Sequence, residues 1–191
     1  PGRHGDVAGA RARLGKRADV PQRREAGVHL GHDDARVGPP HTLTMQPACA
    51  VTSVCISSCG NFGFLGGESG RIDKFNLQSG QRRGGTQPSE SHSGAVRGLA
   101  ADALARALYS GGHDGTLRTF SPADLIRTRT VEVGAPLAFL RHQKDSTLLA
   151  AACDDLCVRV FDMVVGKLVR RLTGYTNTLT DAAWSADGRW L

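Results

Sequence analysis

The chain has 191 residues, of which 40% are hydrophobic and only 5% are aromatic, and its formal net charge at pH 7 is +6. This length allows one or two domains, and the longest apolar runs, at 135–140 and 148–153, are far too short to cross a membrane as helices. No apolar segment follows the first arginines, so we expect no secretory signal. The odd number of cysteines, five, favours free thiols in a reducing intracellular compartment.

Residues 1–45 differ in composition from the rest of the chain. They hold eight of the 24 Lys and Arg residues, and they contain no aromatic residue and no Ile. A segment without such side chains lacks the material for a core, so we predict that it is disordered. Its basic residues could attract phosphates without regard to sequence. We favour instead a solvated tail or a stretch foreign to the folded domain, because no aromatic side chain is interleaved to stack on bases. These basic residues are Arg11, Arg13, Lys16, Arg17, Arg23 and Arg24.

The segment 57–80 has the pattern of a β-meander. Two short runs, 62–67 and 71–77, are rich in Phe, Ile and Leu and are bounded by turn signals that contain glycine, at 59–61, 69–70 and 79–80. Such runs are typical of antiparallel strands joined by tight hairpins. The segments 51–56 and 81–86 supply a strand on either side, so about forty residues would make one sheet the size of a propeller blade.

The same pattern recurs along the chain. Residues 111–120 repeat 66–75, and the two copies end in Phe75 and Phe120, which are 45 positions apart. A third copy at 152–162 ends 41 positions further on in Phe161-Asp162, where the WD repeat places Trp-Asp. Both intervals agree with the WD40 period of roughly 40–45 residues. A fourth copy opens at 174–175, and its residues 185–190 echo 57–62.

We therefore predict an all-β fold of WD40-type β-propeller blades, about three and a half of them, preceded by the disordered segment 1–45. The WD40 repeat region would be 46–191, with blades at about 51–86, 92–130 and 135–172 and a partial blade at 174–191. Propellers remove their sheet edges by closing with four to eight blades. An incomplete set cannot close, so we expect either a fragment or blades supplied elsewhere, and self-association through exposed blade faces.

One polar pair is expected to be structural. His92 opens the second unit, and Asp114 lies in a later turn of that unit. A buried hydrogen bond between them would tie the two loops together, because neither group should be buried unpaired. The alternative is that both are exposed, since Phe120 lacks the further donor that a Trp would supply, and the sequence leaves both open. The outer strand 167–172, with Lys167, Arg170 and Arg171, would discourage strand addition and could meet an acidic partner.

No catalytic, cofactor-binding or metal-binding residue is predicted. The glycine-rich segments 66–70 and 111–115 precede strands and are assigned to turns, whereas phosphate-binding loops open helices. Four cysteines form two pairs without the four converging ligands of a structural zinc site; they are Cys55, Cys59, Cys153 and Cys157. Asp154 and Asp155 should point apart as neighbours in a turn, and His41 and His142 are isolated.

Several runs resemble one particular WD-repeat family. Residues 58–62 and 69–80 are similar to its run CGNF…SG…YNMQSG, and residues 154–172 and 185–190 are similar to its run DDLSI…D…VR…SPDGRW. The family is the WD-repeat subunit of the small-subunit processome, in the UTP-B subcomplex and associated with the U3 small nucleolar RNA. The resemblance covers about 51–191.

The resemblance implies a non-catalytic scaffold in the nucleus, specifically the nucleolus, needed for the early pre-rRNA cleavages that release 18S rRNA. It implies other WD-repeat processome proteins of UTP-B as partners, direct or indirect contact with pre-rRNA and U3 RNA, and no cofactor, membrane or small-molecule substrate. The alternative is a WD40 peptide-binding adaptor or substrate receptor in ubiquitin-ligase, chromatin or signalling complexes. A propeller enzyme is disfavoured, because the sequence shows no paired carboxylates or histidine cluster.

Overall fold

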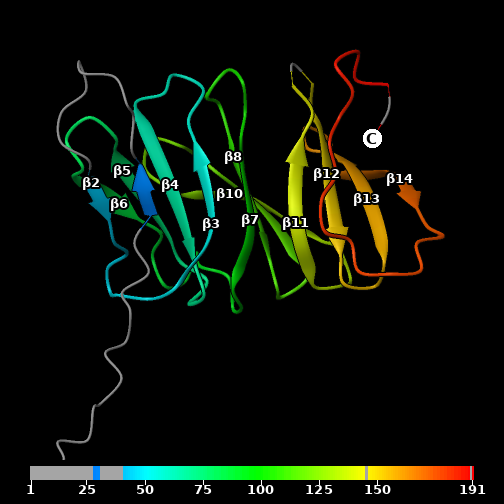
Figure 1. The fold of residues 1–191 in the computed structure, drawn as a ribbon, viewed down its shortest axis with the longest axis horizontal. Helices are drawn as coiled ribbons and strands as arrows, with labels where there is room; N and C mark the ends of the chain where they lie inside the picture. The colour runs from blue at the N-terminus through cyan, green and yellow to red at the C-terminus, as the bar shows by residue number, and fades with distance from the viewer. Residues whose placement is uncertain (1–27, 31–40, 145, 190) are drawn as a thin grey trace, which may run out of the picture.

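A computed structural model describes residues 28–30, 41–144, 146–189 and 191 of the chain. This part contains fourteen β-strands and no helix, and so no helix that could cross a membrane. The strands form three four-stranded sheets and one two-stranded sheet, all antiparallel, and the three larger sheets stand side by side (Figure 1). The prediction of an all-β fold built from repeated four-stranded blades is confirmed.

Each large sheet is a meander in which consecutive strands pair. The first sheet contains β3 (Val51–Ile56), β4 (Phe62–Gly67), β5 (Ile72–Asn76) and β6 (Arg82–Gly85). The second contains β7 (Val96–Ala101), β8 (Leu108–Gly112), β9 (Thr116–Phe120) and β10 (Arg127–Glu132). The third contains β11 (Leu137–His142), β12 (Leu148–Cys153), β13 (Cys157–Asp162) and β14 (Lys167–Leu172).

The repeat extends to the register of the strands. Phe75, Phe120 and Phe161 each face a residue near the start of the fourth strand of their own sheet. In all three sheets the ladder is interrupted at the next position, so that residues 83, 128 and 169 are bulged. A β-bulge increases the local twist of a strand, and its recurrence at equivalent positions shows that the sheets are copies of one unit.

The sheets pack face to face through apolar side chains. β7 lies between β3 and β11, so the first strands of the three sheets are neighbours. Phe64 and Ile72 of the first sheet meet Phe120 of the second in one cluster of buried residues. A larger cluster joins the second and third sheets; its members include Tyr109, Leu117, Leu137, Leu149 and Phe161. Burial of each such side chain contributes about 1.5–3 kcal/mol, which makes these interfaces the main stabilising feature.

The glycine-rich segments contain glycines of two kinds, some in turns and some inside strands. Gly70 and Gly115 have positive φ, +81° and +75°, and lie in turns as predicted. Gly66 and Gly111, however, lie inside β4 and β8, where a Cβ atom would come within 2.6 Å of Val96 Cγ1 and of Leu137 Cδ2, respectively. The assignment of 66–70 and 111–115 to turns is therefore wrong at these two positions, whereas the strand predicted at 62–67 does include Gly66. They are glycines because the next sheet packs against their backbone.

The two ends of the described chain differ from the sequence expectation. Most of the segment 1–45, predicted to be disordered, lies outside the described residues. Within it, β1 (Val28–Leu30) pairs with β2 (His41–Leu43), and Leu43 and Met45 are buried against Leu65. The composition did not predict this, because two isolated apolar side chains suffice to cover the outer face of an existing sheet.

The expected partial blade at 174–191 contains no strand among its described residues, 174–189 and 191. Instead, Leu179, Trp184 and Leu191 pack on the apolar face of the third sheet, against Ala150 and Val160. Trp184 Nε1 donates a hydrogen bond to the carbonyl of Arg141 at 2.9 Å. A strand needs a hydrogen-bonding neighbour on its edge, and this segment covers the sheet without finding one.

Candidate functional site

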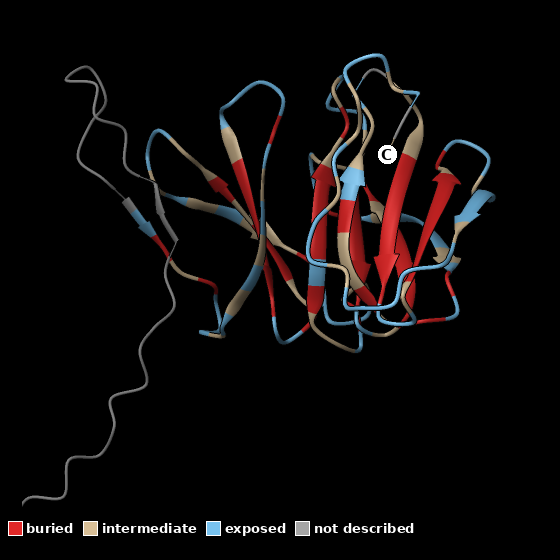
Figure 2. Ribbon diagram, turned by 45° about the vertical axis from the view of Figure 1, so that its right-hand side comes forward, coloured by how far each residue is buried: buried red, intermediate tan, exposed pale blue. Residues whose placement is uncertain are grey.

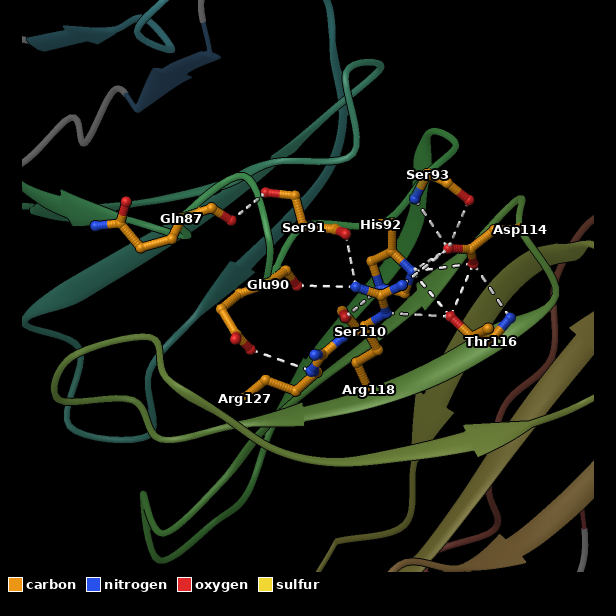
Figure 3. A network of polar contacts seen from close by, with 10 residues as sticks. All are labelled: Gln87, Glu90, Ser91, His92, Ser93, Ser110, Asp114, Thr116, Arg118 and Arg127. Carbon is orange, nitrogen blue, oxygen red and sulfur yellow. Dashed lines mark hydrogen bonds and ion pairs between the residues drawn. The ribbon is translucent and has the colours of Figure 1, made fainter.

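The most extensive network of buried polar contacts in the described chain lies in the second sheet (Figure 3). His92 comes from the loop before β7, Ser110 from β8, and Asp114 from the turn between β8 and β9. His92 Nδ1 is 3.0 Å from Asp114 Oδ1, and His92 Nε2 is 2.7 Å from Ser110 Oγ. His92 is 3% exposed, so the predicted buried pair is confirmed and the alternative, in which both groups are exposed, is wrong.

The surroundings of the imidazole determine its protonation state. Burial lowers the pKa of His92 below its ordinary value, although the nearby Asp114 carboxylate acts in the opposite direction. The ring is therefore neutral at pH 7, with the Nδ1 proton directed to Asp114 and Nε2 accepting the hydroxyl proton of Ser110. Burial alone would raise the pKa of Asp114, but the polar contact with His92 and the hydrogen bonds from Thr116 and the Ser93 backbone act in the opposite direction, so this pKa is lowered and the carboxylate is ionised.

Three further groups complete the network, and sequence reasoning missed them. Thr116 donates to Asp114 Oδ1 from its hydroxyl at 2.8 Å, and the Ser93 backbone N–H donates to Oδ2 at 3.1 Å. Arg118 Nη1 donates to the carbonyls of Glu90 and Ser91, at 2.9 and 2.6 Å. Arg118 thus fixes the loop that carries His92. Arg118 supplies the extra donor that Phe120 lacks. Its position in the sequence, two residues before Phe120, was the signal from which this role could have been predicted.

The arrangement of Ser110, His92 and Asp114 has the contacts of a hydrolytic triad, which raises the question of catalysis. A nucleophilic serine must reach a substrate carbonyl and have an oxyanion site beside it. Ser110 is 0% exposed, in the middle of β8, with sheets packed on both sides. No substrate can reach Oγ in this structure. The geometry instead holds the loop before β7 against the turn between β8 and β9, which is a structural role.

The other two sheets use related positions differently. In the third sheet, Arg159 and Asp155 occupy the places of Arg118 and Asp114 and form a two-pronged ion pair, with Nη1 2.9 Å from Oδ1. In the first sheet the equivalent of Arg118 is Asp73, which is 0% exposed and accepts hydrogen bonds from Arg82 Nη2 at 2.8 Å and from the backbone N–H of residue 46 at 2.9 Å. Each sheet therefore ties its loops with its own charged group.

The residues considered for metal binding do not converge in the described chain. Cys55 lies on β3 and Cys59 in the following turn, while Cys153 and Cys157 face each other across the hairpin of β12 and β13. All four are free thiols, and no group of three or more His, Cys, Asp or Glu side chains suited to a metal ion occurs among the described residues. His41 lies on β2, and His142 stacks on Tyr109 with ring centroids 5.3 Å apart. Asp155 belongs to the ion pair above, whereas Asp154 approaches His113.

The basic edge predicted at 167–172 is the fourth strand of the third sheet, β14. Lys167, Arg170 and Arg171 are all exposed there. The fourth strands of the other two sheets also carry basic side chains; these are Arg82, Arg83, Arg127 and Arg129. We call β6, β10 and β14 the outer strands, because each ends its sheet on the side away from β3, β7 and β11.

Comparison with known proteins identifies the repeat. The family model of the WDR36/Utp21 second beta-propeller domain matches residues 35–191. The human WD repeat-containing protein 36 is 36% identical over 141 residues, which cover 74% of this chain and 16% of that protein. The U3 small nucleolar RNA-associated protein 21 homolog of Schizosaccharomyces pombe is 37% identical over 153 residues, or 79% of this chain and 17% of that protein. The chain thus spans about one sixth of the length of these relatives.

Solved structures agree on the fold. The crystal structure of RRP9 WD40 repeats superposes with a TM-score of 0.63 and 17% sequence identity, covering 66% of this chain and 39% of that one. The structure of U3-55K gives a TM-score of 0.62 at 17% identity, covering 66% of this chain and 40% of that one. At this level of identity the likeness shows the WD40 fold alone. Taken with the match over residues 35–191, it leads to the conclusion that the chain belongs to the WDR36/Utp21 second beta-propeller domain family.

Proposed function

We propose that this chain is part of a non-catalytic scaffold for ribosome biogenesis, a component of the small-subunit processome that acts in pre-rRNA processing and 18S rRNA maturation. The observation that carries the proposal is its membership of the WDR36/Utp21 family, whose fungal relatives are named for their association with U3 small nucleolar RNA. The proposed partners are other WD-repeat proteins of the UTP-B subcomplex, and the proposed location is the nucleolus. The docking units are the three blades, at about 51–86, 92–130 and 135–172.

The architecture suits a scaffold. Three copies of one rigid sheet pack through their faces, so each copy presents its turns and its outer strand to the surroundings. Binding residues are commonly placed on loops that such a framework holds. The internal polar groups of the second sheet are used to fix loops, and the one serine with triad-like contacts is inaccessible. These features support docking in preference to chemistry.

The test is affinity purification of the tagged 191-residue chain from nucleolar extract, followed by quantification of U3 RNA and identification of co-purified proteins. We expect enrichment of U3 RNA over an abundant spliceosomal RNA, together with WD-repeat processome proteins. A destabilised comparison is the Asp114→Ala variant, which breaks the network of the second sheet and should lower this enrichment. Recovery of ubiquitin-ligase or chromatin proteins without U3 RNA would contradict the proposal and support a peptide-binding adaptor instead.

A further inference from the structure

We propose that the outer strands β6, β10 and β14 form a basic band that binds the phosphate backbone of RNA directly and without sequence preference. The proposal deepens the proposed function and rests on it for the choice of RNA over other polyanions. It assigns a surface and a partner class to a scaffold whose RNA association could equally pass through protein neighbours.

The positive charge of the three blades is concentrated on their outer strands. Seven of the residues on these strands are basic and one, Glu132, is acidic. By contrast β3, β4, β8 and β12 carry no charged residue, and the other five blade strands, β5, β7, β9, β11 and β13, carry one Lys or Arg residue each. The basic residues are Arg82, Arg83, Arg127, Arg129, Lys167, Arg170 and Arg171. Clustering on one strand type in all three blades is the electrostatic footprint expected of a surface that meets a polyanion.

Three of these side chains are available for a ligand. Arg83, Lys167 and Arg170 are exposed, and no ion pair with another described residue is seen for any of them. The others are engaged to different degrees. Arg82 pairs with the buried Asp73, and Arg127 Nε is 3.1 Å from Glu90 Oε2. The band therefore combines anchored arginines, which fix the local geometry, with unpaired cations that can neutralise phosphates.

Contacts between neighbouring blades help to position the outer strands. Arg129 on β10 donates to the carbonyls of Met163 and Val164, at 3.3 and 2.8 Å, in the turn that leads to Lys167 at the start of β14. Lys74 on β5 makes the equivalent bridge from the first blade, to the carbonyls of residues 122 and 123 before β10, at 2.7 and 3.1 Å. Each of the first two blades thus holds the turn before the next outer strand. Figure 2 shows that β14 itself remains largely exposed.

The chemistry of the band favours phosphate over an acidic protein surface. Six of the seven cations are arginines, whose planar guanidinium matches phosphate oxygens in a two-pronged geometry. The outer strands contain no aromatic residue, and protein interfaces are enriched in aromatic anchors that bury near their centre. The same lack means that bases have nothing to stack on, so binding should depend on the backbone and on salt concentration.

The experiment measures binding of the 191-residue chain to fluorescently labelled polyuridine RNA by anisotropy at several salt concentrations. The test variant replaces the three available cations by glutamine, Arg83→Gln, Lys167→Gln and Arg170→Gln together. The control variant replaces three exposed cations outside the outer strands, Arg97→Gln, Lys144→Gln and Arg189→Gln, none of which shows an ion pair with a described residue. Both variants lower the net charge by the same amount. Urea unfolding confirms that both remain folded.

We expect the test variant to lose about 2 from the slope of log Kobs against log salt, since each single-strand phosphate contact contributes about 0.7. At 0.1 M salt this corresponds to binding weakened roughly 100-fold. The control variant should change the affinity several-fold less. Equal effects of the two variants, or no RNA binding by the unmodified chain at about 0.05 M salt, would overturn the proposal. So would binding to polyglutamate that is tighter than binding to RNA and is lost in the test variant, because the occupant would then be an acidic protein.

These outcomes are separable from failure of the proposed function. If the chain recovers U3 RNA from extract but the unmodified chain does not bind polyuridine, the scaffold function stands and direct RNA contact through the outer strands is refuted. If the chain binds polyuridine through the band but recovers no U3 RNA or processome proteins, the surface is confirmed and the processome assignment fails.

Discussion

The polar network of the second sheet can be tested by removing its central acceptor. The Asp114→Ala substitution deletes a carboxylate that accepts hydrogen bonds from His92 Nδ1, from the Ser93 backbone and from both the hydroxyl and the backbone N–H of Thr116. It also removes the negative partner of Arg118 Nη2 at 3.4 Å. The side chain of Asp114 is 8% exposed, so water cannot freely replace it.

The size of the effect follows from the groups left without a partner. His92 and the Thr116 backbone N–H are buried donors that lose their acceptor, and each such group costs about 1–3 kcal/mol. His92 keeps a weaker contact with the Thr116 hydroxyl at 3.1 Å, and Arg118 keeps the carbonyls of Glu90 and Ser91. We therefore expect a loss of about 3 kcal/mol in the free energy of unfolding, a large share of the roughly 5–15 kcal/mol of a typical domain.

The measurement is urea unfolding followed by tryptophan fluorescence and circular dichroism. With a denaturant slope of about 2 kcal/mol per M, the midpoint should fall by roughly 1.5 M urea. Asp181→Ala serves as the control, because Asp181 also pairs with an arginine, Arg141, but its side chain is 69% exposed. Its midpoint should match that of the unmodified chain. If the two substitutions shift the midpoint equally, the argument that the buried network stabilises the second sheet is refuted.

Three further predictions concern the same framework. Stability should fall as the pH is lowered below about 6.5, because the lowered pKa of His92 means that the unfolded chain binds more protons than the folded chain in this range. The urea midpoint of the His92→Gln variant should therefore depend less on pH, and an unchanged dependence would contradict this. Gly70→Ala should lower the melting temperature of the chain far more than Gly60→Ala. Both glycines have positive φ, but only a Cβ atom at position 70 would collide with the His92 carbonyl. Equal melting temperatures of the two variants would contradict this. Phe120→Ala should cost about 3–5 kcal/mol by urea unfolding, because the ring is 0% exposed between two sheets; a loss below 1 kcal/mol would show that these sheets do not pack as described.

The strands were predictable because their signals are local. The runs predicted at 51–56 and 62–67 coincide with β3 and β4, and those at 71–77 and 81–86 differ from β5 and β6 by one residue at each end. The hairpin turns were also readable, because Gly70 and Gly115 adopt the positive φ that such turns need. The spacing between equivalent phenylalanines was then enough to predict the repeat, without any information on tertiary contacts.

The features that sequence reasoning missed are all set by neighbours that are distant in the chain. The assignment of the segments 66–70 and 111–115 to turns missed the role of Gly66 and Gly111, which is to let the next sheet approach their backbone. The pairing of Asp73 with Arg82 depends on a bulged register between β5 and β6 that no local pattern shows. The burial of Leu43 depends on an existing sheet face, which composition cannot reveal.

Only part of the candidate site could be predicted from the sequence, again because the rest is set by neighbours that are distant in the chain. The pair His92 and Asp114 follows from the repeat pattern, and the network around them depends on the loop that Arg118 holds through backbone carbonyls. Carbonyl acceptors carry no sequence signal, because every residue has one. The basic residues of β14 were noticed singly, and only the strand order showed that equivalent strands in the other blades are basic too.

We propose that this chain belongs to a scaffold for making the small ribosomal subunit, and the most direct test is to deplete the gene product in its own cells and measure newly made rRNA by pulse labelling. We expect newly made 18S rRNA to fall while its uncleaved precursor accumulates, with the large-subunit rRNA unchanged. Expression of the unmodified protein should restore 18S rRNA, and expression of the destabilised Asp114→Ala variant should restore it less. Normal 18S rRNA production after depletion would contradict the claim.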